Sequence, residues 1–387
     1  MDFSYSDEQR MLKDMVDRLV ADQYDFETRE AARASSVGYS ADMWRQFAEL
    51  GLLGVPLSED AGGFDGGGAE LMVVAEGFGR GLVVEPYLAS VVLCGHLIDK
   101  LADQTRKAEI AGPLISGETR YALACHEPDG GCDPYWIATT ARADGGGYVL
   151  DGTKAVVAHG DSADHLIVIA RSSGEPGDRD GLSAFLVDAT ANGVTRRGYP
   201  TIDGHRAADI TLENARVDAD ALLGELGLAS SALDGALERG VIYLCAEATG
   251  AMARACELTL EYLKERKQFG APIGSFQALQ HRMVDMRIAL EKVRSLTFWA
   301  ACSLDSAPDE RGQRIAAAKV MVGRAGRHVA EEAIQLFGGM GMMEESAIAH
   351  YAKRIIMIDH WLGDHRWHMA AFRRAVADGE NAWANAA

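Results

Sequence analysis

The chain has 387 residues, of which 48% are hydrophobic and 25% are charged, and its formal net charge is −19. This length predicts two or three domains with ample core, and the composition is that of an ordinary globular protein. The acidic balance argues against a surface that binds nucleic acid or an anionic membrane. The sequence has no apolar window long enough to span a membrane and no recognisable signal peptide, so we expect neither.

The cysteines do not follow the spacing of a metal site or a disulfide framework. There are six of them, at positions 94, 125, 132, 245, 256 and 302. We therefore expect reduced thiols in a cytoplasmic protein, and we assign no metal ligands.

Residues 1–119 are predicted to form an N-terminal helical domain. Ser6 and Gln9 form a capping box ahead of an apolar helical face. Ser40 is placed to cap a second helix, which is expected to end at Gly51. Further helical patterns follow at 69–80, 86–101 and 103–115.

From residue 120 the pattern changes to short apolar or alternating runs separated by glycine-rich and polar turns. These runs are 121–125, 148–150, 166–170 and 184–187. The sequence therefore predicts a small β-domain of antiparallel strands over residues 120–225.

Residues 226–387 are predicted to form a C-terminal antiparallel four-helix bundle. The four helical patterns are 229–266, 275–304, 311–337 and 344–377. Pro308 and the Gly338-Gly339 pair are expected to separate them. The chain as a whole is therefore assigned to the α+β class.

The junction between the first two bundle helices carries side chains that suit a nucleotide. If the helix extends far enough, Arg266 and Phe269 share a face, before Gly270 and Pro272 end the helix. Ser275 is a plausible cap for the next helix. A guanidinium suits a phosphate and an aromatic ring suits a flat heterocycle. An ordinary exposed arginine beside a core phenylalanine remains the alternative.

Several separated motifs together resemble the acyl-CoA dehydrogenase family over nearly the whole chain. They are Arg266-Lys-Gln-Phe-Gly270 with Gln277, Gln335-Leu-Phe-Gly-Gly-Met-Gly341, Trp44-Arg-Gln-Phe-Ala-Glu-Leu-Gly51 and Glu59-Asp-Ala-Gly-Gly63. The resemblance implies a helical domain, a β-domain and a helical bundle in that order, with FAD as cofactor. It also implies the family reaction, in which a carboxylate takes the α-proton of an acyl-CoA thioester while the β-hydride passes to the flavin.

By this resemblance, the FAD lies across a subunit interface and the bundle holds its ADP portion. Arg266 would pair with the pyrophosphate, Phe269 would pack near the adenosine, and Gln277 would hydrogen-bond the cofactor. Gln335 and the backbone of the two glycines would lie against the adenine and ribose, although the glycines alone equally fit a tight turn. The implied cofactor-binding set is Arg266, Gln268, Phe269, Gln277, Gln335, Gly338 and Gly339.

The segment that resembles the flavin-ring contacts departs from the family pattern. Where the family has Thr-Glu-Pro and a later serine, this chain has His126 before Glu127, and Cys132. Where the family has Lys-x-Trp-Ile-Thr, Val156 and Ala158 replace the tryptophan and the threonine. Neither replacement can stack on a flavin ring or donate a hydrogen bond to it.

The position of the usual catalytic base also differs from the family pattern. Leu362 stands at that position, and the alternative position in the first bundle helix falls on Gly240 and Val241. We therefore assign no catalytic residue. The weak candidates are Glu238, Glu247 and Asp364, and Glu247 is more readily interpreted as a structurally paired carboxylate. The polar cluster of Asp359, His360, His365 and His368 is interpreted as a solvated or interface face rather than a metal site.

Intact ADP motifs with missing flavin and base motifs resemble the non-catalytic subunits of α2β2 acyl-CoA dehydrogenases, including those acting on pimeloyl-CoA and on steroid side-chain CoA esters. The implied partners are a homologous catalytic chain, an electron-transferring flavoprotein and an acyl-CoA substrate. Two alternatives remain: a self-sufficient homotetramer with a relocated base, and a scaffold subunit without flavin. Dicarboxylic, steroid and branched acyl groups are equally compatible with the sequence.

Overall fold

The computed structural model describes residues 5–304 and 306–384, and these form two compact units. The bundle unit takes its described residues from the ranges 1–30, 67–83 and 241–387. The sheet unit comprises residues 31–66 and 84–240. Helices from the N-terminal region therefore group with the C-terminal helices.

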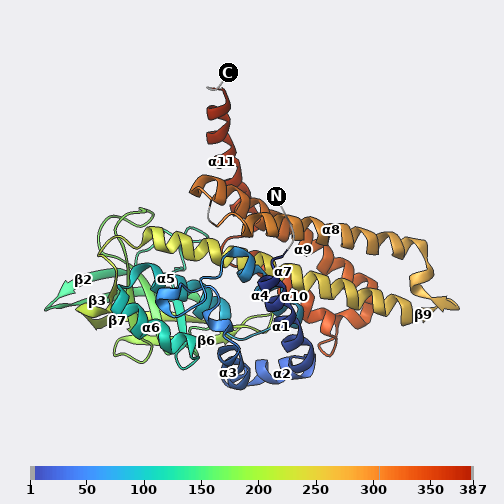
Figure 1. Cartoon of the computed structure of the whole chain (residues 1–387), viewed down its shortest axis with the longest axis horizontal. Helices are drawn as coiled ribbons and strands as arrows, with labels where there is room; N and C mark the ends of the chain where they lie inside the picture. Colours follow the sequence, from blue (N-terminus) through green and yellow to red (C-terminus); the bar gives the residue numbers. More distant parts are fainter. Residues whose placement is uncertain (1–4, 305, 385–387) are drawn as a thin grey trace. The chain divides into compact units, whose positions relative to one another are not determined.

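The bundle unit is built around a long helix, α9, which packs against α8, α10 and α11 (Figure 1). The N-terminal helix α1 packs against α4, and α4 also contacts α8. The helices are α1 (Asp7–Gln23), α2 (Phe26–Ala34, shared with the sheet unit), α4 (Gly68–Gly81), α7 (Ser230–Glu265, whose first turns belong to the sheet unit), α8 (Gln277–Ala301), α9 (Pro308–Phe337), α10 (Ala347–His360) and α11 (His365–Ala384).

The last two predicted bundle helices differ from the expectation. Pro308 does not separate helices but occupies the first turn of α9, where its missing N–H has no intrahelical partner to lose. The single helix expected over 344–377 is divided into α10 and α11 by a turn at 361–364. Leu362 and Gly363 adopt φ values of 55° and 88° in this turn, which a continuous helix does not accommodate.

Glycines allow α4 and α7 to approach each other closely. A Cβ added to Gly79 would lie 2.0 Å from the carbonyl oxygen of Glu247, and one added to Gly250 would lie 1.9 Å from that of Glu76. Backbone contacts at this distance leave no room for a side chain. The crossing fixes the position of the middle of α7.

The helix starts predicted in the N-terminal region are confirmed. The amide of Gln9 donates to Ser6 Oγ at 3.1 Å, and the amide of Ser6 donates to Gln9 Oε1 at 3.0 Å, which completes the capping box. The amide of Met43 donates to Ser40 Oγ at 3.2 Å, and Gly51 follows the helix with a φ of 74°. The helix expected over 86–101 consists instead of a π-helical segment followed by α5.

The sheet unit contains short helices and a mixed sheet. Its helical segments are α3 (Ala41–Glu49), η1 (Leu52–Gly54), η2 (Glu59–Ala61), the π-helical η3 (Tyr87–Cys94), α5 (Gly95–Leu101), α6 (Gln104–Ile115) and η4 (Ala219–Ala221). Its strands are β1 (Tyr121–Ala124), β2 (Thr140–Asp144), β3 (Gly147–Ala158), β4 (His165–Arg171), β5 (Leu182–Asp188), β6 (Val194–Pro200), β7 (Arg206–Asp218) and β8 (Leu222–Leu223).

The strand order is β6-β7-β3-β2-β4-β5-β8, with β1 paired to β4. Most pairs are antiparallel, as expected, but β1 runs parallel to β4, and β2 meets β4 in parallel at one residue. The antiparallel expectation is wrong for this part of the sheet. Leu150, Leu166, Phe185 and Ile210 are among the apolar residues that fill its core.

Strands β2, β6 and β7 were not indicated by the sequence. β7 pairs with both β3 and β6, and only its middle alternates apolar and polar residues, with Ile210 and Leu212 buried. This alternation is short and is flanked by charged residues, so the two neighbouring strands extend the strand beyond it. Within the described part of the chain, no helix is long and apolar enough to cross a membrane.

Candidate cofactor-binding site

A short β-hairpin, rather than a helix end, presents the first cofactor motif. Helix α7 ends at Glu265, and β9 (Lys267–Gln268) pairs with β10 (Ala271–Pro272). The two turn residues, Phe269 and Gly270, have φ values of 55° and 80°, which is the pattern of a type I′ turn. The expectation that Arg266 and Phe269 share a helical face is therefore wrong.

Ser275 does not cap the next helix. Its hydroxyl donates to the carbonyl of Pro272 at 2.7 Å, and α8 begins at Gln277 after Phe276. Ser275 instead closes the short η5 turn (Ile273–Ser275) that follows the hairpin. Pro272 and Gly274 favour a turn at this point, and the serine hydroxyl bonds within that turn instead of capping α8.

The two cofactor motifs meet at one end of the bundle unit. The ring of Tyr262, at the end of α7, stacks on the ring of Phe337, at the end of α9, with centroids 4.3 Å apart. Arg282 of α8 forms a bidentate ion pair with Glu332 of α9, at 2.5 and 3.0 Å. The glycine turn η6 (Gly338–Met342) follows α9 directly, and Figure 1 shows the hairpin strand β9 beyond the ends of α7 and α8.

Every residue of the predicted cofactor set is exposed at this end. The side chain of Phe269 is 94% exposed, and a Cβ added to Gly338 or Gly339 would meet no described atom within 4 Å. Among the described residues, no protein group hydrogen-bonds the Arg266 guanidinium. The ring of Phe276, which is also exposed, lies 6.2 Å from that of Phe269, and grouped exposed apolar side chains are typical of a binding surface. Free donors, an aromatic ring and an open glycine backbone fit the ADP portion of FAD.

The segment that resembles the flavin contacts contains a buried ion pair. Lys154 Nζ lies 2.7 Å from Glu127 Oε1, and both side chains are almost fully buried. The Glu127 carboxylate also accepts the backbone N–H groups of Ala138 at 2.7 Å and Thr139 at 3.0 Å. Burial opposes its ionisation, but the Lys154 ammonium and these amides lower the pKa of Glu127 below its usual range. Glu127 therefore has a structural role: its carboxylate binds Lys154 of β3 and the backbone next to β2.

Val156 stands in a polar environment that differs from a flavin-stacking surface. It is 47% exposed and has a φ of 52°, which is strained for a β-branched residue. Its amide donates to Asp209 Oδ1 at 3.3 Å, and the same carboxylate accepts from Tyr199 and Arg197 at 2.9 and 2.8 Å. At the two positions predicted to face a flavin ring, Val156 and Ala158 have side chains that can neither stack on the ring nor donate a hydrogen bond to it.

The turn that bears Leu362 is held rigidly by two buried basic groups. Lys319 donates to the carbonyls of Ile358 and Trp361, the latter at 2.8 Å, and burial lowers the pKa of Lys319 to about 8. His368 Nε2 bonds the carbonyl of Leu362 at 2.9 Å, so that nitrogen carries the proton. Burial lowers the pKa of His368 to about 4. These bonds fix the backbone of the turn where the sequence predicts the base position, and the Leu362 side chain there cannot accept a proton.

Both oxygens of the Glu247 carboxylate accept hydrogen bonds from one buried arginine. Its two oxygens accept from Arg354 Nε and Nη2 at 2.6 and 2.7 Å, and both side chains are less than 5% exposed. The expectation that Glu247 is structurally paired is confirmed. Both carboxylate oxygens are therefore used in holding α10 to α7.

Asp364 caps a helix. Its Oδ1 accepts the backbone N–H groups of Arg366 at 3.0 Å and Trp367 at 2.8 Å at the start of α11. Partial burial opposes ionisation, but these two amides lower the pKa of Asp364. The third candidate, Glu238, is half-buried on the first part of α7 within the sheet unit.

We expect Asp364→Ala to destabilise the chain by about 1 kcal/mol at pH 7 because an N-cap is lost. The folded pKa of Asp364 is lowered, so its stabilisation is present above the unfolded pKa and is lost as the pH falls through the folded value. The difference from wild type should therefore shrink below about pH 4. Urea unfolding of Asp364→Ala and wild type at pH 7 and pH 3 measures this difference in stability. The exposed Asp14→Ala is the control. An equal difference at both pH values would contradict the capping role.

The histidine cluster next to this turn is structural. Asp359 accepts the backbone N–H of His365 at 2.9 Å and pairs with its Nδ1 at 2.7 Å. With His368 bound to the turn, only His360 of this cluster is exposed, so the expectation of a solvated face is wrong for the other members. Among the described residues, no three or more His, Cys, Asp or Glu side chains gather into a group that could hold a metal ion.

Sequence reasoning missed the ion pair between Glu127 and Lys154 and the cluster around Asp209. Glu127 and Lys154 both lie within motifs that the resemblance identified, so their retention beside the substituted Val156 was an available signal. The cluster of Asp209, Tyr199 and Arg197 had no such signal, because it forms only when β6 and β7 pair.

The chain matches the family profiles of all three acyl-CoA dehydrogenase domains: the N-terminal domain over residues 6–118, the middle domain over 122–215 and the C-terminal domain over 230–376. It is 32% identical to the mitochondrial short-chain specific acyl-CoA dehydrogenase of Bos taurus, over 81% of this chain and 77% of that protein. These matches confirm the expected order of helical domain, β-domain and helical bundle.

Two similar solved structures are complexes of two different chains. The steroid ACAD Tcur3481–Tcur3483 matches with 30% identity and a TM-score of 0.86, over 97% of this chain and 99% of that chain. The ChsE4–ChsE5 complex from Mycobacterium tuberculosis matches with 25% identity and a TM-score of 0.88, over the same shares.

The chain belongs to the acyl-CoA dehydrogenase family. Members of this family are FAD-dependent oxidoreductases that act on CH–CH bonds.

Proposed function

We propose that this chain is the ADP-anchoring, non-catalytic subunit of an α2β2 acyl-CoA dehydrogenase that binds FAD. The proposal rests on the contrast between the part of the family site that binds ADP and the part that binds the flavin ring and holds the base. The exposed hairpin and glycine turn offer Arg266, Phe269 and an open backbone to a nucleotide. Val156 and Leu362 occupy the positions where the family has a stacking ring and a base.

In such an enzyme the bound FAD accepts the hydride removed from the acyl group. This chain would hold the pyrophosphate with Arg266 and would pack Phe269 beside the adenosine. Gln277 and Gln335 supply hydrogen-bonding groups at the same end of the bundle. These residues bind and orient the cofactor, and the proton acceptor belongs to a homologous catalytic partner.

The two-chain composition of the similar steroid ACAD and ChsE4–ChsE5 structures supports a heteromeric assembly. The pairing of Glu247 and the capping role of Asp364 argue against a self-sufficient enzyme that uses either of them as a base. We further propose cytoplasmic location, electron transfer to an electron-transferring flavoprotein, and an acyl-CoA substrate whose acyl pocket lies in the catalytic partner.

The flavin absorbance of this chain, purified alone and together with a homologous acyl-CoA dehydrogenase chain from the same genome, tests the proposal. We expect a colourless lone chain and a yellow complex that holds one FAD for each pair of chains. A lone chain that is yellow and is bleached by an acyl-CoA would overturn the proposal in favour of a self-sufficient enzyme. A complex that assembles without flavin would identify a scaffold subunit instead.

A further inference from the structure

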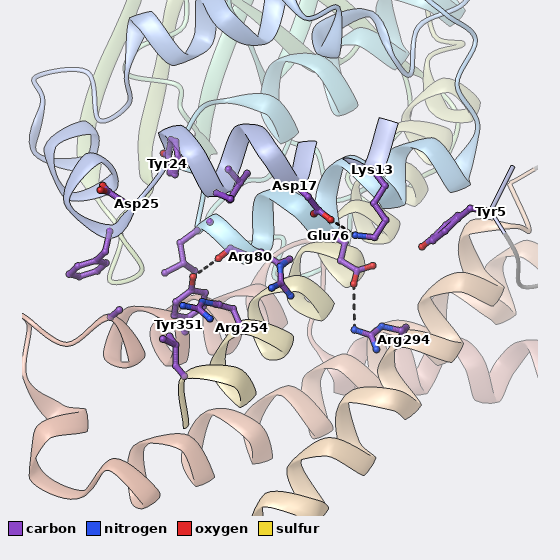
Figure 2. A pocket seen from close by; sticks show the side chains of 17 residues that line it. Tyr5, Lys13, Asp17, Tyr24, Asp25, Glu76, Arg80, Arg254, Arg294 and Tyr351 are labelled. Atoms are coloured by element: carbon purple, nitrogen blue, oxygen red, sulfur yellow. Dashed lines mark hydrogen bonds and ion pairs between the residues drawn. The ribbon is translucent and has the colours of Figure 1, made fainter. Parts of the chain in front are cut away.

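A cavity of about 880 Å³ lies within the bundle unit, and none of the predicted cofactor residues lines it. Its walls come from α1, the start of α2, the end of α4, the middle of α7, α8 and the start of α10 (Figure 2). This volume lies within the range of sites that hold small molecules. All of its lining residues belong to the bundle unit, so it is formed within one compact body.

One part of the cavity is apolar and aromatic. Val20, Leu82 and Leu258 line it together with the rings of Tyr24 and Phe26, and Leu82 and Tyr24 are almost fully buried. Such a wall favours an apolar body, because each buried methylene group contributes roughly 0.8 kcal/mol.

Two guanidinium groups adjoin this apolar part. Arg80 forms a bidentate pair with Glu257 at 3.0 and 2.9 Å, and Arg254 Nη1 reaches the same carboxylate at 3.2 Å. Glu261 approaches Arg254 at 3.5 Å and its side chain is 59% exposed, so its charge is screened by water. In the described part of the chain, Arg254 Nε and Nη2 have no hydrogen-bond acceptor. Arg80 is thus paired with Glu257 and also lies near Asp17 and Glu76, whereas two donor atoms of Arg254 stay open to an anion.

The side chain of Tyr351 lies beside these two guanidinium groups. Its hydroxyl donates to the carbonyl of Arg80, and Figure 2 shows it beside Arg80 and Arg254. Burial raises the pKa of Tyr351 to about 12, while Arg254, Arg80 and Arg29 act in the opposite direction.

The cations at the other end of the cavity are compensated individually. Lys13 pairs with Asp17 at 2.5 Å on α1. Arg294 pairs with Glu291 at 2.8 Å and with Glu76 at 3.5 Å. A ligand anion has no advantage there or on the paired Arg80, which leaves Arg254 Nε and Nη2 as the anion-binding atoms.

We propose that this cavity binds an amphipathic carboxylate, with its carboxylate on Nε and Nη2 of Arg254 and its aliphatic body against Leu82, Leu258 and Phe26. A guanidinium presents two parallel N–H donors that match a carboxylate. The apolar wall beside the arginines excludes a small hydrophilic anion as the preferred ligand. This site is additional to the proposed cofactor function and does not depend on it.

Isothermal titration calorimetry with decanoate tests the proposal on the full chain and on its complex with the catalytic partner. We expect one decanoate per copy of this chain. Arg254→Met should weaken binding at least tenfold by removing the charge, and Leu258→Trp should weaken it similarly by filling the apolar part. Arg287→Met, an exposed arginine of α8 that does not line the cavity, is the matched control and should bind as wild type does. Thermal melting of each variant establishes that it is folded.

Decanol and inorganic phosphate test the role of Arg254 and the role of the apolar wall separately. Decanol, which lacks the charge, and phosphate, which lacks the apolar body, should each bind at least tenfold more weakly than decanoate. Equal binding of decanol would overturn the role of Arg254, and equal binding of phosphate would overturn that of the apolar wall. The whole site is refuted if decanoate does not bind, or if it binds folded Arg254→Met and Leu258→Trp as tightly as wild type.

Discussion

Replacing Glu247 with alanine is expected to lower the free energy of unfolding by about 3–5 kcal/mol. The substitution leaves the guanidinium of Arg354 buried without its bidentate partner, in a site where both side chains are less than 5% exposed. The close crossing of α4 and α7 at Gly79 and Gly250 prevents water from reaching the charge easily. Urea unfolding followed by circular dichroism measures the loss.

Two further variants separate the ion pair from general disruption of the bundle. Glu331→Ala breaks the exposed pair with Arg327 on α9, and its effect should stay within about 0.5 kcal/mol. The double variant Glu247→Met with Arg354→Leu should recover most of the lost stability, because paired apolar residues replace both charges. A loss below about 1 kcal/mol for Glu247→Ala would show that Arg354 finds water or another partner.

The same carboxylate provides a test of the missing base. Glu247→Gln should leave turnover of the complex with the catalytic partner unchanged once the complex is folded, because Glu247 holds Arg354 rather than a substrate proton. A folded Glu247→Gln complex that loses turnover would restore Glu247 as a catalytic residue. Size-exclusion chromatography of the same sample establishes that the complex is assembled.

Replacing Arg266 with alanine is expected to raise the dissociation constant of FAD from the complex by roughly 10- to 100-fold. This range corresponds to one charge-assisted hydrogen bond, worth about 1.5–3 kcal/mol. The guanidinium is exposed beside the hairpin and has no protein acceptor among the described residues, so its loss should not disturb the fold. Flavin fluorescence during titration of the apo-complex with FAD measures the constant.

Lys267→Ala is the control for Arg266→Ala, because Lys267 is an exposed cation of the same hairpin that belongs to no predicted cofactor contact. We expect it to bind FAD as wild type does. If both variants weaken FAD equally, the hairpin acts through its general positive charge. If Arg266→Ala binds FAD normally, the chain does not anchor the pyrophosphate and acts as a scaffold.

Much of the helical architecture was predictable because its signals are local. The capping box of Ser6 and Gln9, the cap at Ser40 and the glycine after α3 each act within one turn of chain, and all three formed as expected. The pairing of Glu247 was also predictable, because a carboxylate among small apolar residues of a buried helix needs a partner. The sequence alone does not identify Arg354 as that partner, since it lies 107 residues away.

Features that depend on distant neighbours were not predictable. Strand β7 has only a short alternation around Ile210 and Leu212, and pairing with β3 and β6 on its two sides extends it over Arg206–Asp218. The parallel placement of β1 against β4 has no local signature either. At the hairpin, the helical periodicity of α7 suggested that Arg266 was helical, whereas the turn at Phe269 and Gly270 determined the local backbone.

The sequence by itself determined the family, and the prediction that Leu362, Val156 and Ala158 replace the base and flavin contacts follows from their places in motifs. Only the tertiary structure decided what the remaining charged groups do. Glu247, Asp364 and Glu127 are carboxylates of the same chemistry, yet a buried arginine, a helix end and a buried lysine give each a structural role. The reason is physical: the reactivity of a carboxylate depends on burial and on its bonded partners, and folding brings those partners from distant parts of the chain.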